Sequence, residues 1–78
     1  MPRFFFHIRE GVFREIDPVG CEFASLEHAI IDARKAAREI LAERIVADEP
    51  IDRQQFEITD EKGKVLETVP FRSVLRMN

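Results

Sequence analysis

The sequence contains one cysteine, Cys21, so no disulfide can form within the chain. It has only two histidines and lacks C-x-x-C, H-x-x-x-H and EF-hand spacings, so we predict no metal site. The three glycines are isolated, which excludes a glycine-rich loop that would hold a phosphate. Neither serine, Ser25 or Ser73, lies in a G-x-S-x-G nucleophile motif. No cofactor is therefore expected.

The sequence also lacks a net positive charge and long apolar runs. The net charge of −3 gives no general attraction to nucleic-acid phosphates or anionic lipid. No apolar run has the length of a membrane span, and the stretch near Met1 is too short for a signal peptide. Seven phenylalanines argue against disorder. We therefore expect one αβ domain over residues 1–78, in the cytoplasm, with no membrane partner.

Residues 3–9 and 12–16 have the composition of two strands, and Glu10-Gly11 between them predicts a two-residue turn. That turn places Ile8 opposite Phe13 and His7 opposite Arg14. One face of the hairpin then carries Phe4, Phe6, Ile8 and Phe13, and the other carries Phe5, His7, Val12 and Ile16. The turn-forming residues 17–20 end the hairpin.

Residues 26–45 predict an amphipathic helix, because apolar residues recur at helical spacing along one side. Its alanines allow the helix axis to lie close to a sheet, and Ser25 is a natural N-cap. Residues 54–59 and 64–69 predict a second hairpin. A three-residue loop would pair Ile58 with Leu66 and Glu57 with Glu67. The apolar spacing of Phe71, Val74 and Leu75 predicts a short helical turn.

This order predicts an α+β fold, ββαββ, in which a four-stranded antiparallel sheet has the helix packed on one face. The strand order stays open, because residues 3–9 could pair with either arm of the second hairpin. The sheet face opposite the helix would expose Phe5, Val12, Ile16, Val65 and Val69. Either the C-terminal residues or a second chain would have to cover this face, and a chain of this size gains stability from a partner.

We therefore expect a non-enzymatic module that binds another copy of itself, as a homodimer, or another protein. The candidate interaction face consists of Phe5, His7, Val12, Arg14 and Ile16.

Two alternatives remain open. Arginines cluster in the first hairpin and on the outer side of the helix, which could make a small nucleic-acid-binding or regulatory module. The acidic total charge disfavours nucleic acid. His7 could instead be the general base of an enzyme, although the sequence shows no convergent partner for it. Cys21 and His28 would form a nucleophile pair only if they were in contact.

The opening Met1-Pro2-Arg3-Phe4-Phe5-Phe6-His7 resembles that of a family of small bacterial proteins described only as a domain of unknown function. The Asp17 to Gly20 segment, the alanine-rich helix and the stretch from Thr59 to Phe71 share the resemblance, although Tyr is usual where Phe4 stands. The resemblance implies a bacterial intracellular protein. It implies no activity and no catalytic residues.

Overall fold

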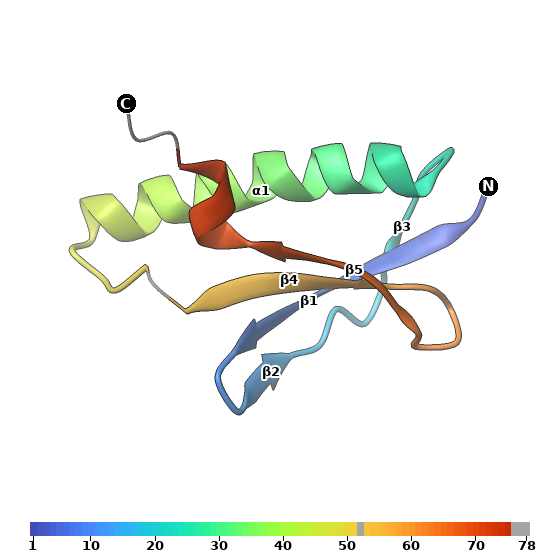
Figure 1. Ribbon diagram of the computed structural model, residues 1–78, viewed down its shortest axis with the longest axis horizontal. Helices are drawn as coiled ribbons and strands as arrows, with labels where there is room; N and C mark the ends of the chain where they lie inside the picture. Colours follow the sequence, from blue (N-terminus) through green and yellow to red (C-terminus); the bar gives the residue numbers. More distant parts are fainter. Residues whose placement is uncertain (52, 76–78) are drawn as a thin grey trace.

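The structure is a computed structural model that describes residues 1–51 and 53–75. One long helix lies over one face of an antiparallel sheet (Figure 1). The elements are β1 (Arg3–Glu10), β2 (Phe13–Glu15), β3 (Cys21–Glu22), α1 (Leu26–Val46), β4 (Gln54–Thr59), β5 (Val65–Pro70) and the 3-10 turn η1 (Phe71–Val74). The strands lie in the order β2-β1-β4-β5, and β3 also pairs with β1.

The α+β class with an antiparallel sheet is confirmed, but the predicted order ββαββ is incomplete because it lacks β3. A strand of two residues is too short to give an alternating sequence pattern. The strand order, which the sequence left open, is now known: β1 pairs with β4, the first arm of the second hairpin.

The predicted helix is confirmed and extends one residue further, to Val46. Ser25 is its N-cap, and its Oγ accepts a hydrogen bond from the His28 N–H. Ala29, Ala33 and Ala37 are fully buried. Because alanine has only a methyl side chain, α1 can lie close to the sheet between Ala29 and Ala37.

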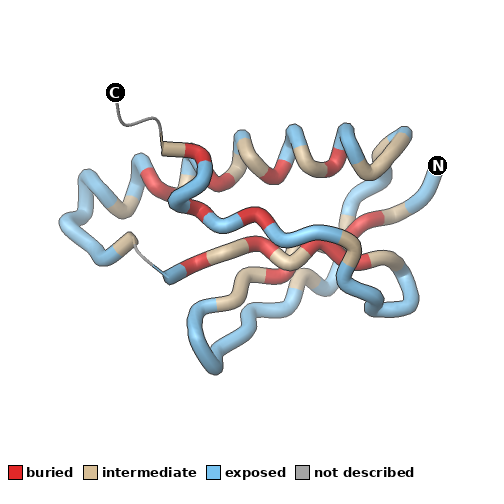
Figure 2. Tube along the Cα trace, viewed as in Figure 1, coloured by how far each residue is buried: buried red, intermediate tan, exposed pale blue. Residues whose placement is uncertain are grey.

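The core lies between α1 and the sheet, where Figure 2 shows the buried positions of both. The predicted C-terminal turn is confirmed as η1. Its residues Phe71 and Val74 are buried, and the Phe71 ring lies 4.9 Å from that of Phe56 in β4. The turn therefore helps to close the core rather than to cover the opposite sheet face.

The predicted register of the first hairpin is wrong by two residues. Ile8 faces Glu15, not Phe13, because the turn consists of Gly11 and Val12 and has its positive φ, +61°, at the first of these positions. A shift of two keeps every side chain on its predicted face. Phe13 nevertheless lies outside the core, because β2 is a three-residue edge strand away from α1 (Figure 1).

The predicted register of the second hairpin fails beyond a β-bulge between Ile58 and Thr59. The extra residue places Glu67 opposite Ile58 and Thr68 opposite Glu57, so the two glutamates no longer face each other. It also places Val69 opposite Phe56, and Val69 is buried in the core. The prediction of Val69 on the open face is therefore wrong.

No helix within residues 1–51 and 53–75 is both long and apolar enough to cross a membrane.

Candidate functional site

A single stretch of chain covers one edge of β1 in three steps: β2, then Asp17, then β3. Oδ2 of Asp17 accepts a hydrogen bond from the Phe6 N–H at 3.1 Å. Oδ1 accepts hydrogen bonds from the N–H groups of Val19 and Gly20, both at 3.1 Å. The carboxylate therefore takes the place of a strand residue where β2 has ended and β3 has not begun.

The same contacts determine the charge state of Asp17. Its partial burial would by itself raise the pKa of the carboxyl group. The three backbone N–H groups, together with His7, outweigh burial and hold the pKa below its ordinary value. Asp17 is therefore ionised at neutral pH and accepts from all three donors.

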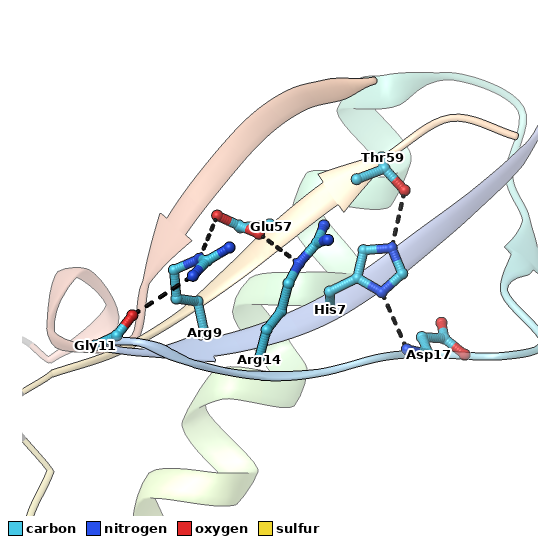
Figure 3. A network of polar contacts seen from close by, with 7 residues as sticks. All are labelled: His7, Arg9, Gly11, Arg14, Asp17, Glu57 and Thr59. Carbon is cyan, nitrogen blue, oxygen red and sulfur yellow. Dashed lines mark hydrogen bonds and ion pairs between the residues drawn. The ribbon is translucent and has the colours of Figure 1, made fainter. Parts of the chain in front are cut away.

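The His7 side chain links Asp17 to Thr59 of β4 through hydrogen bonds at its two ring nitrogens, as Figure 3 shows. Its side chain is 8% exposed, and Nδ1 accepts a hydrogen bond from the Asp17 N–H at 3.0 Å. Nε2 lies 3.1 Å from Oγ1 of the buried Thr59. Because Nδ1 accepts, the proton of the neutral ring is on Nε2 and is donated to Thr59. Burial first, and Arg14 second, lower the pKa of His7 against the opposing effects of Asp17 and Glu57.

This neutral His7 should make stability depend on pH. Below pH 6.5 the unfolded chain protonates this histidine while the folded chain does not, so acidification from pH 7 should lower the free energy of unfolding. The slope is at most about 1.4 kcal/mol per pH unit within the window between the two pKa values. Urea titrations between pH 7 and pH 5 measure it.

The matched variants are His7→Gln and His28→Gln. His7→Gln should remove most of the slope, whereas His28→Gln, which replaces an exposed histidine, should retain it. Equal slopes in the two variants would contradict the assignment of a neutral, buried His7.

A second cluster lies beside His7 on the same sheet face. Glu57 stands between two arginines (Figure 3), with Oε2 at 2.9 Å from Arg9 Nε and Oε1 at 2.9 Å from Arg14 Nε. The Glu57 side chain is largely buried. The two arginines, which the sequence analysis considered as possible contacts to nucleic acid, thus share one carboxylate of the same chain, which compensates half of their combined charge.

The structure separates the predicted interaction face into a covered and an exposed part. His7 is buried and Phe5 half-buried, with its ring stacked beside the His7 ring at 6.3 Å. Val12 and Ile16 are 89% and 55% exposed, and Arg14 is also exposed.

Sequence reasoning missed the exposure of Phe13, which is 77%, because it placed this residue on the hairpin face of Phe4, Phe6 and Ile8, which was expected to face the helix. Val19 is 68% exposed as well. Residues 12–19, here named the edge segment, therefore carry four exposed apolar side chains: Val12, Phe13, Ile16 and Val19. No sequence signal marked this exposure, because the second strand was predicted over residues 12–16 and its length of three residues is seen only in the structure.

The remaining candidate nucleophiles do not come together. Cys21 is exposed, and its Sγ donates a hydrogen bond to the Glu22 carbonyl oxygen at 3.8 Å. Nδ1 of His28 is instead 2.8 Å from Oγ of Ser25, the N-cap of α1. Within the described part of the chain, no group of three His, Cys, Asp or Glu side chains could hold a metal ion.

The fold and the edge segment thus define a small α+β domain with an open, apolar sheet edge. The chain belongs to the family named Domain of unknown function (DUF6894), whose model matches residues 3–72. No curated protein and no solved structure matches it.

Proposed function

We propose that this domain is a non-enzymatic protein-binding module, that its partner is a second copy of the same chain, and that it binds through the edge segment. The observation that carries the proposal is the concentration of exposed apolar side chains on residues 12–19. Single exposed apolar residues are ordinary on a protein surface, whereas several on one short stretch are typical of an interaction site.

The other exposed large apolar side chains of the described residues are divided among α1, β5 and the start of the chain. They are Met1, Ile31, Ile45, Val46 and Val65. The edge segment differs from them because it places four such side chains within eight residues around an edge strand, whereas β5, the strand at the other end of the sheet order, carries one, Val65. An edge strand offers backbone donors and acceptors as well as apolar area, and both favour a protein partner.

The polar groups of the opposite sheet face support a binding role rather than a catalytic one. Nδ1 of His7 already accepts a backbone N–H, so its lone pair cannot take a proton from a substrate without breaking that bond. The ring is also tied to Thr59. His7 therefore acts in this proposal as a structural residue that fixes the edge segment to β4.

The arginines support a protein partner over nucleic acid. Arg9 and Arg14 bind Glu57, and Arg34 donates to Oγ and to the carbonyl oxygen of Ser73. Arg44 donates to the Pro50 carbonyl oxygen. Glu57 compensates one of the two positive charges of Arg9 and Arg14, and the bonds to Ser73 and Pro50 orient Arg34 and Arg44 without changing their charge. With a net charge of −3, the chain has no overall excess of positive charge to bind phosphates.

The proposal is tested by two glutamine variants at residues of similar exposure. Phe13→Gln removes the largest side chain of the edge segment, and Ile31→Gln removes an exposed side chain of α1. We expect Phe13→Gln to weaken self-association about 10- to 100-fold, because both copies lose a buried aromatic side chain. Ile31→Gln should leave association unchanged. Light scattering across a concentration series measures both.

Because both side chains are exposed, neither change should alter the free energy of unfolding by more than about 0.5 kcal/mol. Loss of folding therefore does not explain a loss of association. Equal association of the two variants and the wild-type chain would exclude the edge segment as the binding surface.

A further inference from the structure

We infer that the second copy adds its own β2 strand to β2, antiparallel and centred on Arg14, so that the two sheets become continuous. This inference rests on the proposed self-association and specifies its geometry. β2 is one of the two terminal strands in the order β2-β1-β4-β5, and all three of its residues are exposed. Two copies joined at this edge would form the order β5-β4-β1-β2-β2-β1-β4-β5.

The turn of the first hairpin determines which backbone groups are free. Glu10 and Phe13 flank the two-residue turn, so their backbone groups face each other. Backbone groups alternate in direction along a strand, so the N–H and C=O of Arg14 point away from β1. The hydrogen bond from the Phe6 N–H to Asp17 agrees with this alternation, because the backbone groups of the even-numbered residues of β1 point towards β2 and the segment that follows it. Arg14 is thus the one residue within β2 with outward-facing backbone groups.

A two-fold axis at Arg14 makes the segment complementary to itself. Val12 then lies opposite Ile16 of the second copy, and Phe13 lies opposite its Glu15, each pair occurring twice. The first pair covers two exposed apolar side chains on one sheet face. On the other face, the aliphatic part of Glu15 can pack on the Phe13 ring while its carboxylate stays in water.

The neighbouring alignments are less favourable. An axis at Phe13 would require outward backbone bonds from Val12, which lies in the turn and not in the strand. An axis at Glu15 would place two glutamates directly opposite each other, which destabilises a strand pair. Only the alignment at Arg14 uses free backbone groups and covers both Val12 and Ile16.

The charge distribution allows two Arg14 side chains to meet at the axis. Each lies 2.9 Å from an oxygen of its own Glu57, so the axis has a carboxylate on each side of the arginine pair. Because Glu57 is shared with Arg9, it offsets part of the charge of Arg14 and so weakens the repulsion between the two Arg14 side chains. The short ladder buries little area, so we expect a weak, reversible dimer with a Kd of about 1–100 µM.

The experiment follows hydrogen exchange of the Arg14 amide by NMR, in the wild-type chain, at concentrations below and above the expected Kd. The monomer leaves this N–H open to water, and the inferred dimer encloses it. We expect at least a 10-fold slowing of Arg14 exchange at high concentration. The amide of Lys62, in the loop of the second hairpin, serves as the internal control and should keep its rate.

Two variants complete the test. Arg14→Pro removes the N–H and blocks the edge, at an outward-facing position where proline is tolerated in an edge strand. Arg14→Ala removes the same side chain but keeps the N–H. We expect Arg14→Pro to abolish the dimer and Arg14→Ala to retain it within about 3-fold in Kd.

The outcomes separate the two claims. A dimer whose Arg14 amide exchanges at the same rate at all concentrations would overturn this inference but leave the proposed self-association standing. A dimer of folded Arg14→Pro as strong as that of Arg14→Ala would do the same. A wild-type chain that stays monomeric at about 1 mM, well above the expected Kd, would overturn both.

Discussion

Gly20→Ala should lower the free energy of unfolding by about 2–5 kcal/mol, because two costs combine at this position. Gly20 has a φ of +72°, which a residue with a Cβ adopts only with strain. A Cβ built there would lie 2.7 Å from the Phe5 ring and 2.8 Å from the Phe4 carbonyl oxygen. The second contact is with backbone, which cannot move away without disturbing the pairing of β1 with β3.

Gly63→Ala is the matched control for this change. Gly63 also has a positive φ, +84°, but an added Cβ would have no atom within 4 Å. Only the conformational strain remains, so we expect a loss of about 1–2 kcal/mol. Urea denaturation of both variants measures the difference. If Gly20→Ala cost no more than Gly63→Ala, the close approach of Gly20 to β1 would be wrong.

Asp17→Ala should lower the free energy of unfolding by about 3 kcal/mol. The change removes a carboxylate that accepts three backbone N–H bonds and leaves the part-buried Phe6 N–H without its acceptor. The matched control is Asp60→Ala, since Asp60 accepts two N–H bonds in the exposed loop of the second hairpin. Water can replace those bonds, so we expect a loss of about 1 kcal/mol.

The contribution of Asp17 should also depend on pH. Its folded pKa is depressed, so its stabilisation is present above the unfolded value of 3.8 and is lost as pH falls through the folded value. Denaturation from pH 5 down to pH 2 should show a smaller loss of stability for Asp17→Ala than for the wild-type chain. An identical dependence would mean that the carboxylate gains nothing from its three donors.

Asp17 and Gly20 show which features of the fold a single sequence predicts and which it does not. Residues 17–20 have recognisable turn chemistry, and a turn is predicted there. In the structure this turn connects β2 to β3 along the same edge of β1. That role depends on contacts of Asp17 with Phe6 and His7, which are more than nine residues away in the chain. Local patterns do not carry such contacts.

The long helix is the best predicted element because 21 residues of regular spacing leave little ambiguity. The faces of the first hairpin are also correct, since an error of two residues in register does not exchange them. The bulge at Ile58 changes the register of the second hairpin by one residue. Of the two register errors, this is the one that assigned a residue, Val69, to the wrong face of the sheet.

The candidate site was predictable in composition but not in exposure. The alternation of residues 3–16 correctly assigns His7, Arg14 and Ile16 to one face. Which of them are covered depends on where the chain runs after Glu15, and it runs over His7 through Asp17. The exposure of Phe13 follows from the shortness of β2, so the largest exposed side chain of the proposed surface is one that was expected to face the helix.

Sedimentation equilibrium of the wild-type chain, over concentrations up to about 1 mM, tests the central claim most directly. We expect an average mass that rises with concentration from 9.1 kDa towards twice that value, and that stops there because a two-fold edge pairing is closed. A mass of 9.1 kDa at every concentration would contradict the proposal that this domain associates with itself.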